Sequence, residues 1–147
     1  MIKLIAWRLK ILRIMGLDYG EKRIGVAISD ELKMTAQGIT VIKRTLLDKD
    51  IERIKELALE YNVSEIVIGI PKNMNGTLGF MAEEVKEFAK EIKKKISIPV
   101  ELQDERLSSK AAERTLLEGD VSRKKRKEVI DKMAAVYLLQ GYLDSKV

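Results

Sequence analysis

Acidic residues at three separate positions of this 147-residue chain could together perform metal-dependent chemistry. Asp18 follows one short apolar run, and Asp104 and Glu105 follow another. Asp131 lies in a C-terminal segment beside two consecutive alanines. Clustered carboxylates bind hard cations such as Mg²⁺ or Mn²⁺, and two such ions can activate water and stabilise the leaving oxygen in phosphodiester hydrolysis. If the fold brings the three positions together, the chain holds the side chains for that reaction.

Each acidic position also has a plainer interpretation. Asp18 could begin a turn before Gly20. The Asp104–Arg106 stretch could be a surface loop with an internal salt bridge. Asp131 could pair with Lys127, four residues earlier on one helix. Only the combination of the three positions therefore favours a metal site.

The absence of histidine and cysteine excludes several other chemistries. A Ser-His-Asp or Cys-His nucleophile cannot form, and neither can a histidine general base or a thiolate. Zinc sites built on these residue types and disulfide frameworks are excluded as well. Carboxylate-metal chemistry is compatible with what remains.

The apolar pattern predicts one α/β domain that positions these carboxylates. Strands are expected at 10–17, 24–28 and 38–43 as a meander, then at 65–70 and 98–103. Helices are expected at 48–61 with Asp48 as N-cap, at 78–95, at 108–119 and from a Ser122 cap onward. The final helix has an apolar stripe of Val129, Ile130, Met133, Tyr137 and Leu138.

This order of elements predicts a five-stranded mixed sheet with helices on both faces. The first three strands are joined by short connections, and the last two enter through helical crossovers that imply parallel pairing. Ligand sites of open α/β sheets form beyond the carboxyl ends of the strands. Asp18 and the Asp104-Glu105 pair follow such ends, and Ala134 and Ala135 would let the helix of Asp131 approach the sheet closely.

The formal net charge of +5 suggests a polyanionic partner, but its distribution weakens that argument. Four basic residues and no acidic ones lie before residue 15, namely Lys3, Arg8, Lys10 and Arg13. Without them the chain holds 24 basic residues against 23 acidic ones. Nucleic-acid binding must therefore be argued from local groups.

One local group is a basic run at the start of the final helix, formed by Arg123, Lys124, Lys125, Arg126 and Lys127. Cations at a helix N-terminus oppose its dipole, so a phosphate partner would explain the run, although a solvated face is the alternative. Aromatic residues make up only 5% of the chain, which favours contact with the backbone over base stacking.

Further candidate nucleic-acid contacts lie in a loop and beside the carboxylates. The loop before the helix at 78–95 could hold a phosphate on backbone amides, or could be an ordinary turn and cap. Two arginines are candidate phosphate clamps, or could only balance charge. These candidates are Lys72, Asn73, Asn75 and Thr77 in the loop, with Arg23 and Arg106 as the clamps.

No apolar stretch is long enough for a membrane span, and no signal-peptide pattern is present. We therefore expect a cytoplasmic protein without a membrane partner. The expected organisation is a basic and apolar extension at 1–12, followed by a single nuclease domain at 13–147.

Four motifs resemble the YqgF/RuvX family of bacterial Holliday-junction-resolvase-like nucleases. They are GLDYGEKRIGVA at 16–27, IGIPKNMNGT at 68–77, DERLSS at 104–109 followed by Ala111, and DKMAA at 131–135. They occur in the family's order and cover the chain from about residue 13 to its end. Two features depart from the pattern: the first dozen residues are additional, and the strand at 66–70 lacks the glutamate that RuvC-type resolvases carry there.

The resemblance implies a ribonuclease H-like fold and a function. It implies Asp18, Glu105 and Asp131 as a catalytic, metal-binding triad for Mg²⁺ or Mn²⁺, with Asp104 as a further ligand. It also implies a cytoplasmic hydrolase that matures the 5′ end of pre-16S rRNA during ribosome biogenesis. Resolution of Holliday junctions is the family's older proposal and stays open.

Two other classes of function remain to be weighed. A nucleic-acid-binding assembly factor with little cleavage activity would fit the nearly neutral domain. A phosphotransferase of the actin and sugar-kinase type would share the hairpin around Asp18, but such enzymes need two such domains around the nucleotide.

Overall fold

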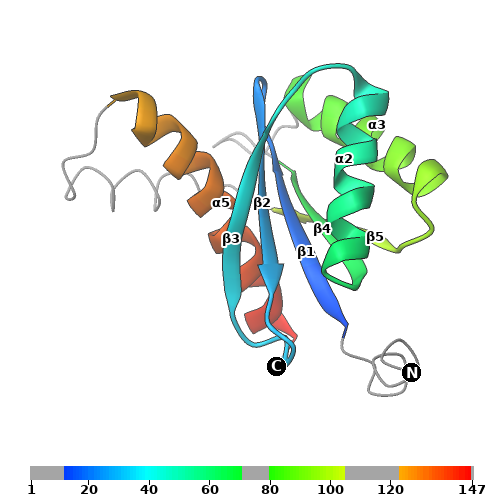
Figure 1. Cartoon of the computed structure of the whole chain (residues 1–147), viewed down its shortest axis with the longest axis vertical. Helices are drawn as coiled ribbons and strands as arrows, with labels where there is room; N and C mark the ends of the chain where they lie inside the picture. Colours follow the sequence, from blue (N-terminus) through cyan, green and yellow to red (C-terminus); the bar gives the residue numbers. More distant parts are fainter. Residues whose placement is uncertain (1–11, 71–79, 105–122, 147) are drawn as a thin grey trace.

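The computed structural model describes residues 12–70, 80–104 and 123–146 and contains one five-stranded sheet (Figure 1). The strands lie in the order β3-β2-β1-β4-β5. β1 pairs with β2 and β2 with β3 in antiparallel orientation, whereas β4 pairs in parallel with both β1 and β5. The predicted mixed sheet is thereby confirmed. The strand bounds are β1 Arg13–Tyr19, β2 Arg23–Ser29, β3 Ala36–Lys43, β4 Val63–Ile70 and β5 Val100–Asp104.

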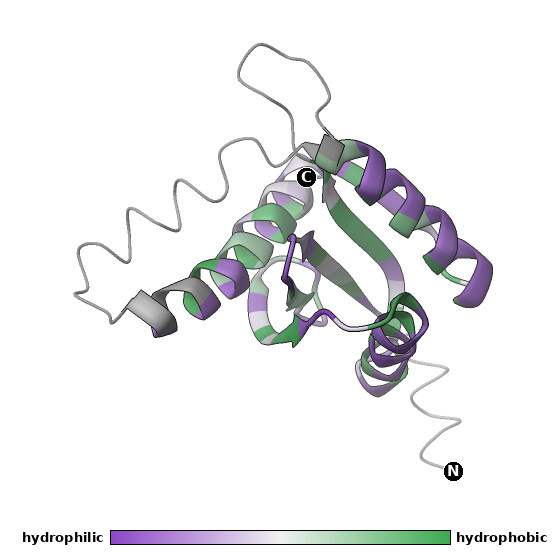
Figure 2. Cartoon of the chain, turned by 90° about the horizontal axis from the view of Figure 1, so that it is seen from above, coloured by the Kyte–Doolittle hydropathy of each residue, from purple (hydrophilic) through white to green (hydrophobic). Residues whose placement is uncertain are grey.

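Helices cover both faces of the sheet, as predicted (Figures 1 and 2). Helices α2 (Leu47–Glu60) and α3 (Phe80–Lys95) lie on one face, and α5 (Arg123–Ser145) lies on the other. The period of two along β1 divides its side chains between the two faces. Leu17 belongs to the larger apolar core under α2 and α3, whereas Ile14 belongs to a smaller core with Leu139 of α5.

Glycines on three neighbouring strands let α5 lie unusually close to the sheet. A Cβ atom at Gly16 of β1 would lie 2.8 Å from the Cβ of Leu139, and one at Gly38 of β3 would lie 2.5 Å from the Cγ of Lys132. A Cβ atom at Gly25 of β2 would fall on the backbone carbonyl oxygen of Asp131. The lack of a side chain at these glycines therefore determines how closely α5 packs against β1, β2 and β3.

The inner face of α5 differs from the predicted stripe. Only Leu138 of that stripe is buried, and Tyr137 is 37% exposed. The buried residues of the helix are Ala134, Ala135, Leu138, Leu139, Tyr142 and Leu143. The prediction was wrong because a surface lined by glycine selects small residues at its closest contact, and hydrophobicity alone does not reveal this.

The start of α2 also differs from the prediction. Asp48 is not the N-cap: the cap is Leu46, which makes no side-chain capping bond. The buried carboxylate of Asp50 instead accepts hydrogen bonds from the backbone N–H of Thr45, at 3.1 Å, and from its hydroxyl, at 3.0 Å. These bonds fix the chain just ahead of the helix. Three predicted features lie outside the described residues. They are the helix at 108–119, the Ser122 cap of the final helix and most of the extension at 1–12.

Among the helices in the described ranges, none has the length and apolar character required to cross a lipid bilayer.

We expect Gly25→Ala to destabilise the protein, because its methyl group would displace Asp131 and the helix that carries it. Overpacking of this kind costs roughly 1–3 kcal/mol, to be measured by chemical denaturation. Gly141→Ala is the matched control, since Gly141 is an exposed position of α5 with open space around it. There alanine should stabilise the helix by about 1 kcal/mol. Equal effects of both substitutions would show that α5 does not rest on Gly25.

Candidate active site

Asp18 lies within β1, on the face of the sheet that α5 covers. Strand β1 continues through Tyr19, so Asp18 does not begin a turn. Gly16, two residues earlier, faces α5, and alternation places Asp18 on the same face. The residue is 8% exposed, which makes it one of the few buried acidic residues in the described part of the chain. Burying a carboxylate is unfavourable unless partners or a cation compensate, so the surroundings of Asp18 must stabilise its charge.

Gly25 brings Asp131 to the same place. Asp18 and Gly25 are direct partners in the antiparallel pair of β1 and β2. The backbone of Asp131 occupies the space that a side chain at Gly25 would fill. Two acidic residues at opposite ends of the sequence thus flank one glycine near the carboxyl end of β1.

The side chain of Asp131 forms an ion pair with Arg23. The side chain of Arg23 is 28% exposed and that of Asp131 is 22% exposed, so the pair is half-buried. Among the described side chains, the charge partner of Asp131 therefore comes from β2. The side chain of Lys127, the alternative partner, is outside the described part of the structure.

Asp104 ends β5 at the same edge of the sheet. It is the register partner of Ile70, the last residue of β4, and β1, β4 and β5 run parallel. The carboxyl ends of these three strands therefore meet at one edge. Glu105 follows directly in the sequence but lies outside the described residues.

The other acidic residue of β4 does not belong to this edge. Glu65 lies near the opposite end of the strand, where it accepts a hydrogen bond from the hydroxyl of Tyr142. This contact and burial raise the pKa of Tyr142. The carboxyl end of β4 is entirely apolar or glycine, as the sequence indicates.

The acidic residues at this edge are of the type that binds a hard divalent cation, but the described residues do not supply a complete set of ligands. Asp18 and Asp131 offer only oxygen atoms, which Mg²⁺ and Mn²⁺ prefer. Within residues 12–70, 80–104 and 123–146, the structure shows no group of three acidic side chains able to hold an ion. The further predicted ligands, the side chains of Asp104 and Glu105, lie outside what the structure describes.

The turn after β1 is held by Tyr19 of the first motif and by Arg44, a residue that the sequence patterns did not single out. The guanidinium of Arg44 lies 4.4 Å from the centroid of the Tyr19 ring and donates hydrogen bonds to the carbonyl oxygens of Gly20 and Glu21. On its other side the Tyr19 ring contacts Phe88, with 4.6 Å between ring centroids. Burial raises the pKa of Tyr19, which keeps its hydroxyl neutral. Arg44 and Tyr19 thus fix the end of β1 that presents Asp18.

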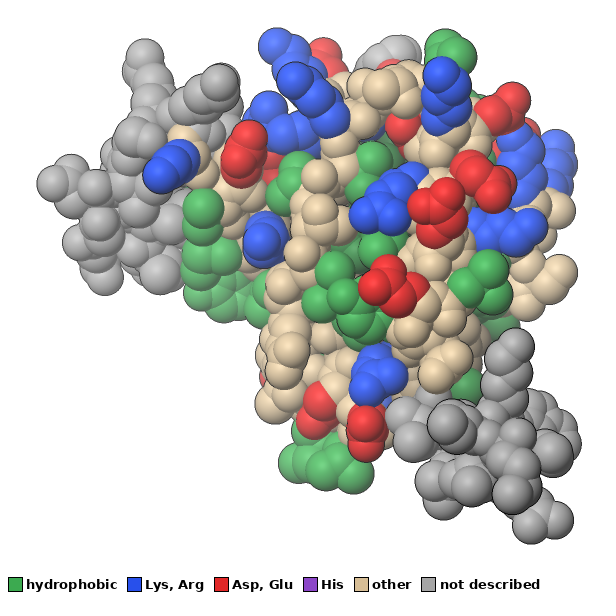
Figure 3. Space-filling model, in the orientation of Figure 1, with side chains coloured by type: hydrophobic (Ala, Val, Ile, Leu, Met, Phe, Trp, Pro, Cys, Tyr) green, Lys and Arg blue, Asp and Glu red, His purple; other side chains and the backbone are tan. Residues whose placement is uncertain are grey.

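Most predicted nucleic-acid contacts fall outside the described residues. These are the loop residues Lys72, Asn73, Asn75 and Thr77, together with Arg106. The basic run forms the first turns of α5, and Lys125 is exposed there. On the face seen in Figure 3, basic and acidic side chains are interspersed rather than gathered in one basic patch. Affinity for a polyanion must therefore come from local features.

Comparison with known proteins identifies the family. The sequence model described as "RuvX: Holliday junction resolvase" matches residues 12–145. A protein of Natranaerobius thermophilus is 59% identical over 136 residues, which cover 92% of this chain and 96% of that protein. A protein of Clostridium acetobutylicum is 54% identical over 134 residues, which cover 91% and 99%. Both relatives are named as candidate pre-16S rRNA nucleases.

Solved structures confirm the fold at low sequence identity. RuvC of T. thermophilus in complex with a Holliday junction substrate has a TM-score of 0.56 at 13% identity, covering 92% of this chain and 95% of that one. The fowlpox virus resolvase in complex with Holliday junction DNA has a TM-score of 0.58 at 15% identity, covering 92% and 99%. The predicted ribonuclease H-like, resolvase-type architecture is thus confirmed, and the chain belongs to the RuvX family.

Proposed function

We propose that this protein is a metal-dependent nuclease that hydrolyses phosphodiester bonds, with the 5′ end of pre-16S rRNA as its substrate. Membership of the RuvX family supports a nuclease. The names of relatives that are more than half identical to this chain support the rRNA substrate. Resolution of Holliday junctions is the second candidate, supported by the description of the family model.

The observation that carries the proposal is the meeting of Asp18 and Asp131 across Gly25. No side chain separates the two positions, because the backbone of Asp131 takes the place of one. Arg23 supplies a positive charge to Asp131 beside this row of residues. Acidic residues gathered near the carboxyl ends of strands, with a cationic side chain next to them, support a site that binds a divalent cation and a phosphate.

We assign Glu105 rather than Asp104 as the third ligand. Val67 of β4 faces α5, so alternation places Gly69 on that face too, and Gly69 is the register partner of Gln103. Alternation counts in steps of two residues, so the position that follows Gln103 on this face is that of Glu105.

Asp18, Glu105 and Asp131 would hold the Mg²⁺ or Mn²⁺ ions, with Asp104 as an additional donor. When bound, the ions would lower the pKa of a coordinated water and stabilise the leaving oxygen. The protein's own contribution is to fix the carboxylates on β1 and α5 and to balance their charge with Arg23. Arg23, Arg106 and the loop residues Lys72, Asn73, Asn75 and Thr77 would contact substrate phosphates.

We expect Asp18→Asn to reduce cleavage of pre-16S rRNA in Mg²⁺ or Mn²⁺ by at least ~100-fold, because the amide removes a charged ligand while keeping its shape. Thermal unfolding and RNA binding in a chelator report whether fold and affinity survive. Asp144→Asn, at the exposed C-terminal end of α5, is the matched control and should cleave like the wild type.

A four-way DNA junction tested beside the RNA separates the two candidate substrates. Cleavage of both substrates at the wild-type rate by the Asp18 variant would exclude a nuclease centred on this residue. RNA binding that survives without any cleavage by the wild type would favour the assembly-factor alternative.

The basic run predicts a second measurable effect. Replacing Lys124, Lys125 and Lys127 by glutamine should weaken RNA binding and make its salt dependence shallower by about 0.7–0.9 per lost phosphate contact. The same change at Lys93, Lys94 and Lys95 of α3 is the charge-matched control on the opposite face of the sheet. Equal losses in both triple variants would mean that only net charge matters and that the run of α5 has no specific role.

A further inference from the structure

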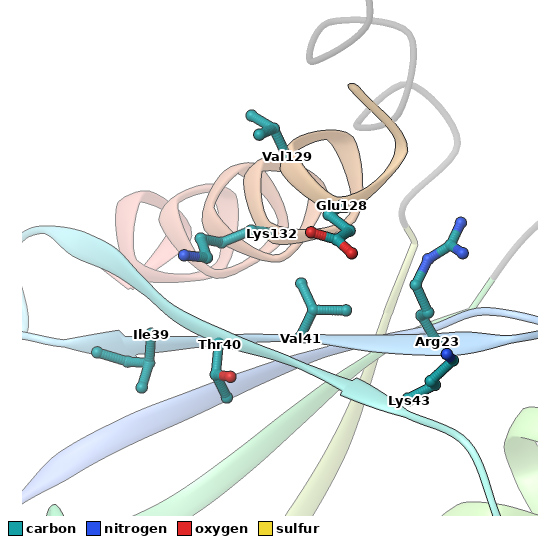
Figure 4. Close-up of a pocket in the computed structure, with 8 residues that line it drawn as sticks. All are labelled: Arg23, Ile39, Thr40, Val41, Lys43, Glu128, Val129 and Lys132. Atoms are coloured by element: carbon teal, nitrogen blue, oxygen red, sulfur yellow. The ribbon is translucent and has the colours of Figure 1, made fainter. Parts of the chain in front are cut away.

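A groove separates the edge strand β3 from the first half of α5 (Figure 4). Its cavity volume is about 470 Å³, and its lining includes Arg23, Thr40, Val41, Lys43, Glu128 and Lys132. In the close-up, Val41 points toward α5 and Thr40 points away from it. Thr40 therefore borders the groove with its backbone.

The groove begins directly beside the acidic site. Gly25 is the register partner of Asp18 on one side and of Val41 on the other, so the three residues form a row across β1, β2 and β3. Adjacent strands lie about 4.8 Å apart, which places Val41 roughly 10 Å from Asp18. Arg23, the ion-pair partner of Asp131, lies at the head of the groove. A polymer bound at the carboxylates could thus continue into this groove.

The charges of the lining favour an anion. Among the described residues of the lining, Arg23, Lys43 and Lys132 are cationic and Glu128 is acidic. Arg23 is paired with Asp131, which leaves the two lysines and Glu128. Arg23 and Lys43 are direct partners across β2 and β3, and like charges at such positions destabilise a sheet. Among the described residues, neither Lys43 nor Lys132 has an acidic ion-pair partner. This excess of positive charge is not explained by the stability of the fold.

The position of Lys132 is set by the same glycine pattern that brings α5 to the sheet. Its aliphatic chain lies over Gly38, where a Cβ atom would approach Cγ to 2.5 Å and Cδ to 2.7 Å. The side chain is half-buried, and this contact restricts its conformations before any ligand binds. A lysine held in place loses less conformational entropy on binding than one that moves freely.

The edge of β3 offers additional donors. On its outer side β3 pairs with no strand of the described part, so some of its backbone N–H groups face outward. The register shifts by one residue between Val26 and Ala27, and such bulges often occur at sheet edges next to active sites. Backbone N–H groups and lysines together are the usual partners of phosphate oxygens.

We propose that this groove binds the sugar-phosphate backbone of the nucleic-acid strand next to the cleaved bond, with Lys43 and Lys132 as positioning residues. The proposal rests on the proposed nuclease function and extends it, because it assigns a path for the substrate away from the carboxylates. Contacts of this kind fix register without reading sequence. Lys43 and Lys132 are therefore expected to affect affinity far more than the chemical step.

Binding of a short single-stranded RNA to the full chain in a chelator tests the groove without any cleavage. Lys43→Gln and Lys132→Gln should each weaken binding by about 3–10-fold and lower the salt slope by about one or less. Glu128→Gln should act in the opposite direction and strengthen binding, because it removes the one carboxylate among the described residues that line the groove. Lys90→Gln on α3, outside the groove, is the matched control and should bind like the wild type.

Gly38→Ala tests the positioning of Lys132 with no change of charge. The added methyl group would push the lysine stem aside, and RNA binding should weaken while the unfolding curve confirms that the protein still folds. Affinities and salt slopes of the Lys43, Lys132 and Glu128 variants that match the Lys90 control would overturn the proposal. The affinity for a single-stranded DNA of the same sequence shows whether the groove prefers ribose or deoxyribose.

The outcomes also separate this proposal from the function on which it rests. If Asp18→Asn keeps full cleavage activity, the proposed active site fails, whatever the groove variants show. If Asp18→Asn loses cleavage but the groove variants keep both their affinity and their KM, the active site stands and the groove proposal fails.

Discussion

The close approach of α5 to a glycine-lined sheet is the constraint on which the rest of the structure depends. Gly16, Gly25 and Gly38 lie on three adjacent strands, and each leaves space that an atom of α5 occupies. This contact buries the smaller apolar core around Leu139. It also brings Asp131 to Asp18 and lays Lys132 along β3. Packing, the acidic site and the groove are thus consequences of one helix position.

The electrostatics of the site run against the stability of the fold. Burial of the Asp18 carboxylate has a cost that its surroundings must offset, and the two cations Arg23 and Lys43, which are partners across β2 and β3, repel each other. The Arg23–Asp131 ion pair compensates only in part, because half-buried pairs of this kind contribute about 1 kcal/mol or less. Opposite charges at adjacent places suit a ligand that carries both signs, such as a phosphodiester accompanied by divalent cations.

The sequence predicts the sheet well because its signals are local. β-branched runs and short turns indicate the strands, and the lengths of the crossovers imply the parallel pairs. The inner face of α5 could not be predicted in this way, because it depends on which residues of the sheet lack a side chain. Asp48 was predicted as a cap from its residue type, whereas the chain enters α2 through the contact of Thr45 with Asp50.

Sequence reasoning identified Asp18 and Asp131 as candidates, and the structure brings these two positions together through Gly25. The proposed roles of Lys43 and Lys132 were not predicted, because the two residues lie far apart in the chain and Lys43 belongs to no motif. Their relation arises only when an edge strand and a distant helix form the two walls of one groove. Net charge could not reveal it either, because the two lysines of the groove belong to a chain whose basic and acidic residues are nearly equal in number once its first residues are set aside.

Because α5 supplies both an acidic residue of the site and one wall of the groove, the two are mechanically coupled. A shift of this helix along the sheet would move Asp131 relative to Asp18 and Lys132 relative to Gly38 by the same amount. Substrate bound against Lys132 would in turn resist such a shift and hold Asp131 in place. In the proposed mode of binding, the same glycines that let the helix approach the sheet would connect substrate binding to the geometry of the carboxylates.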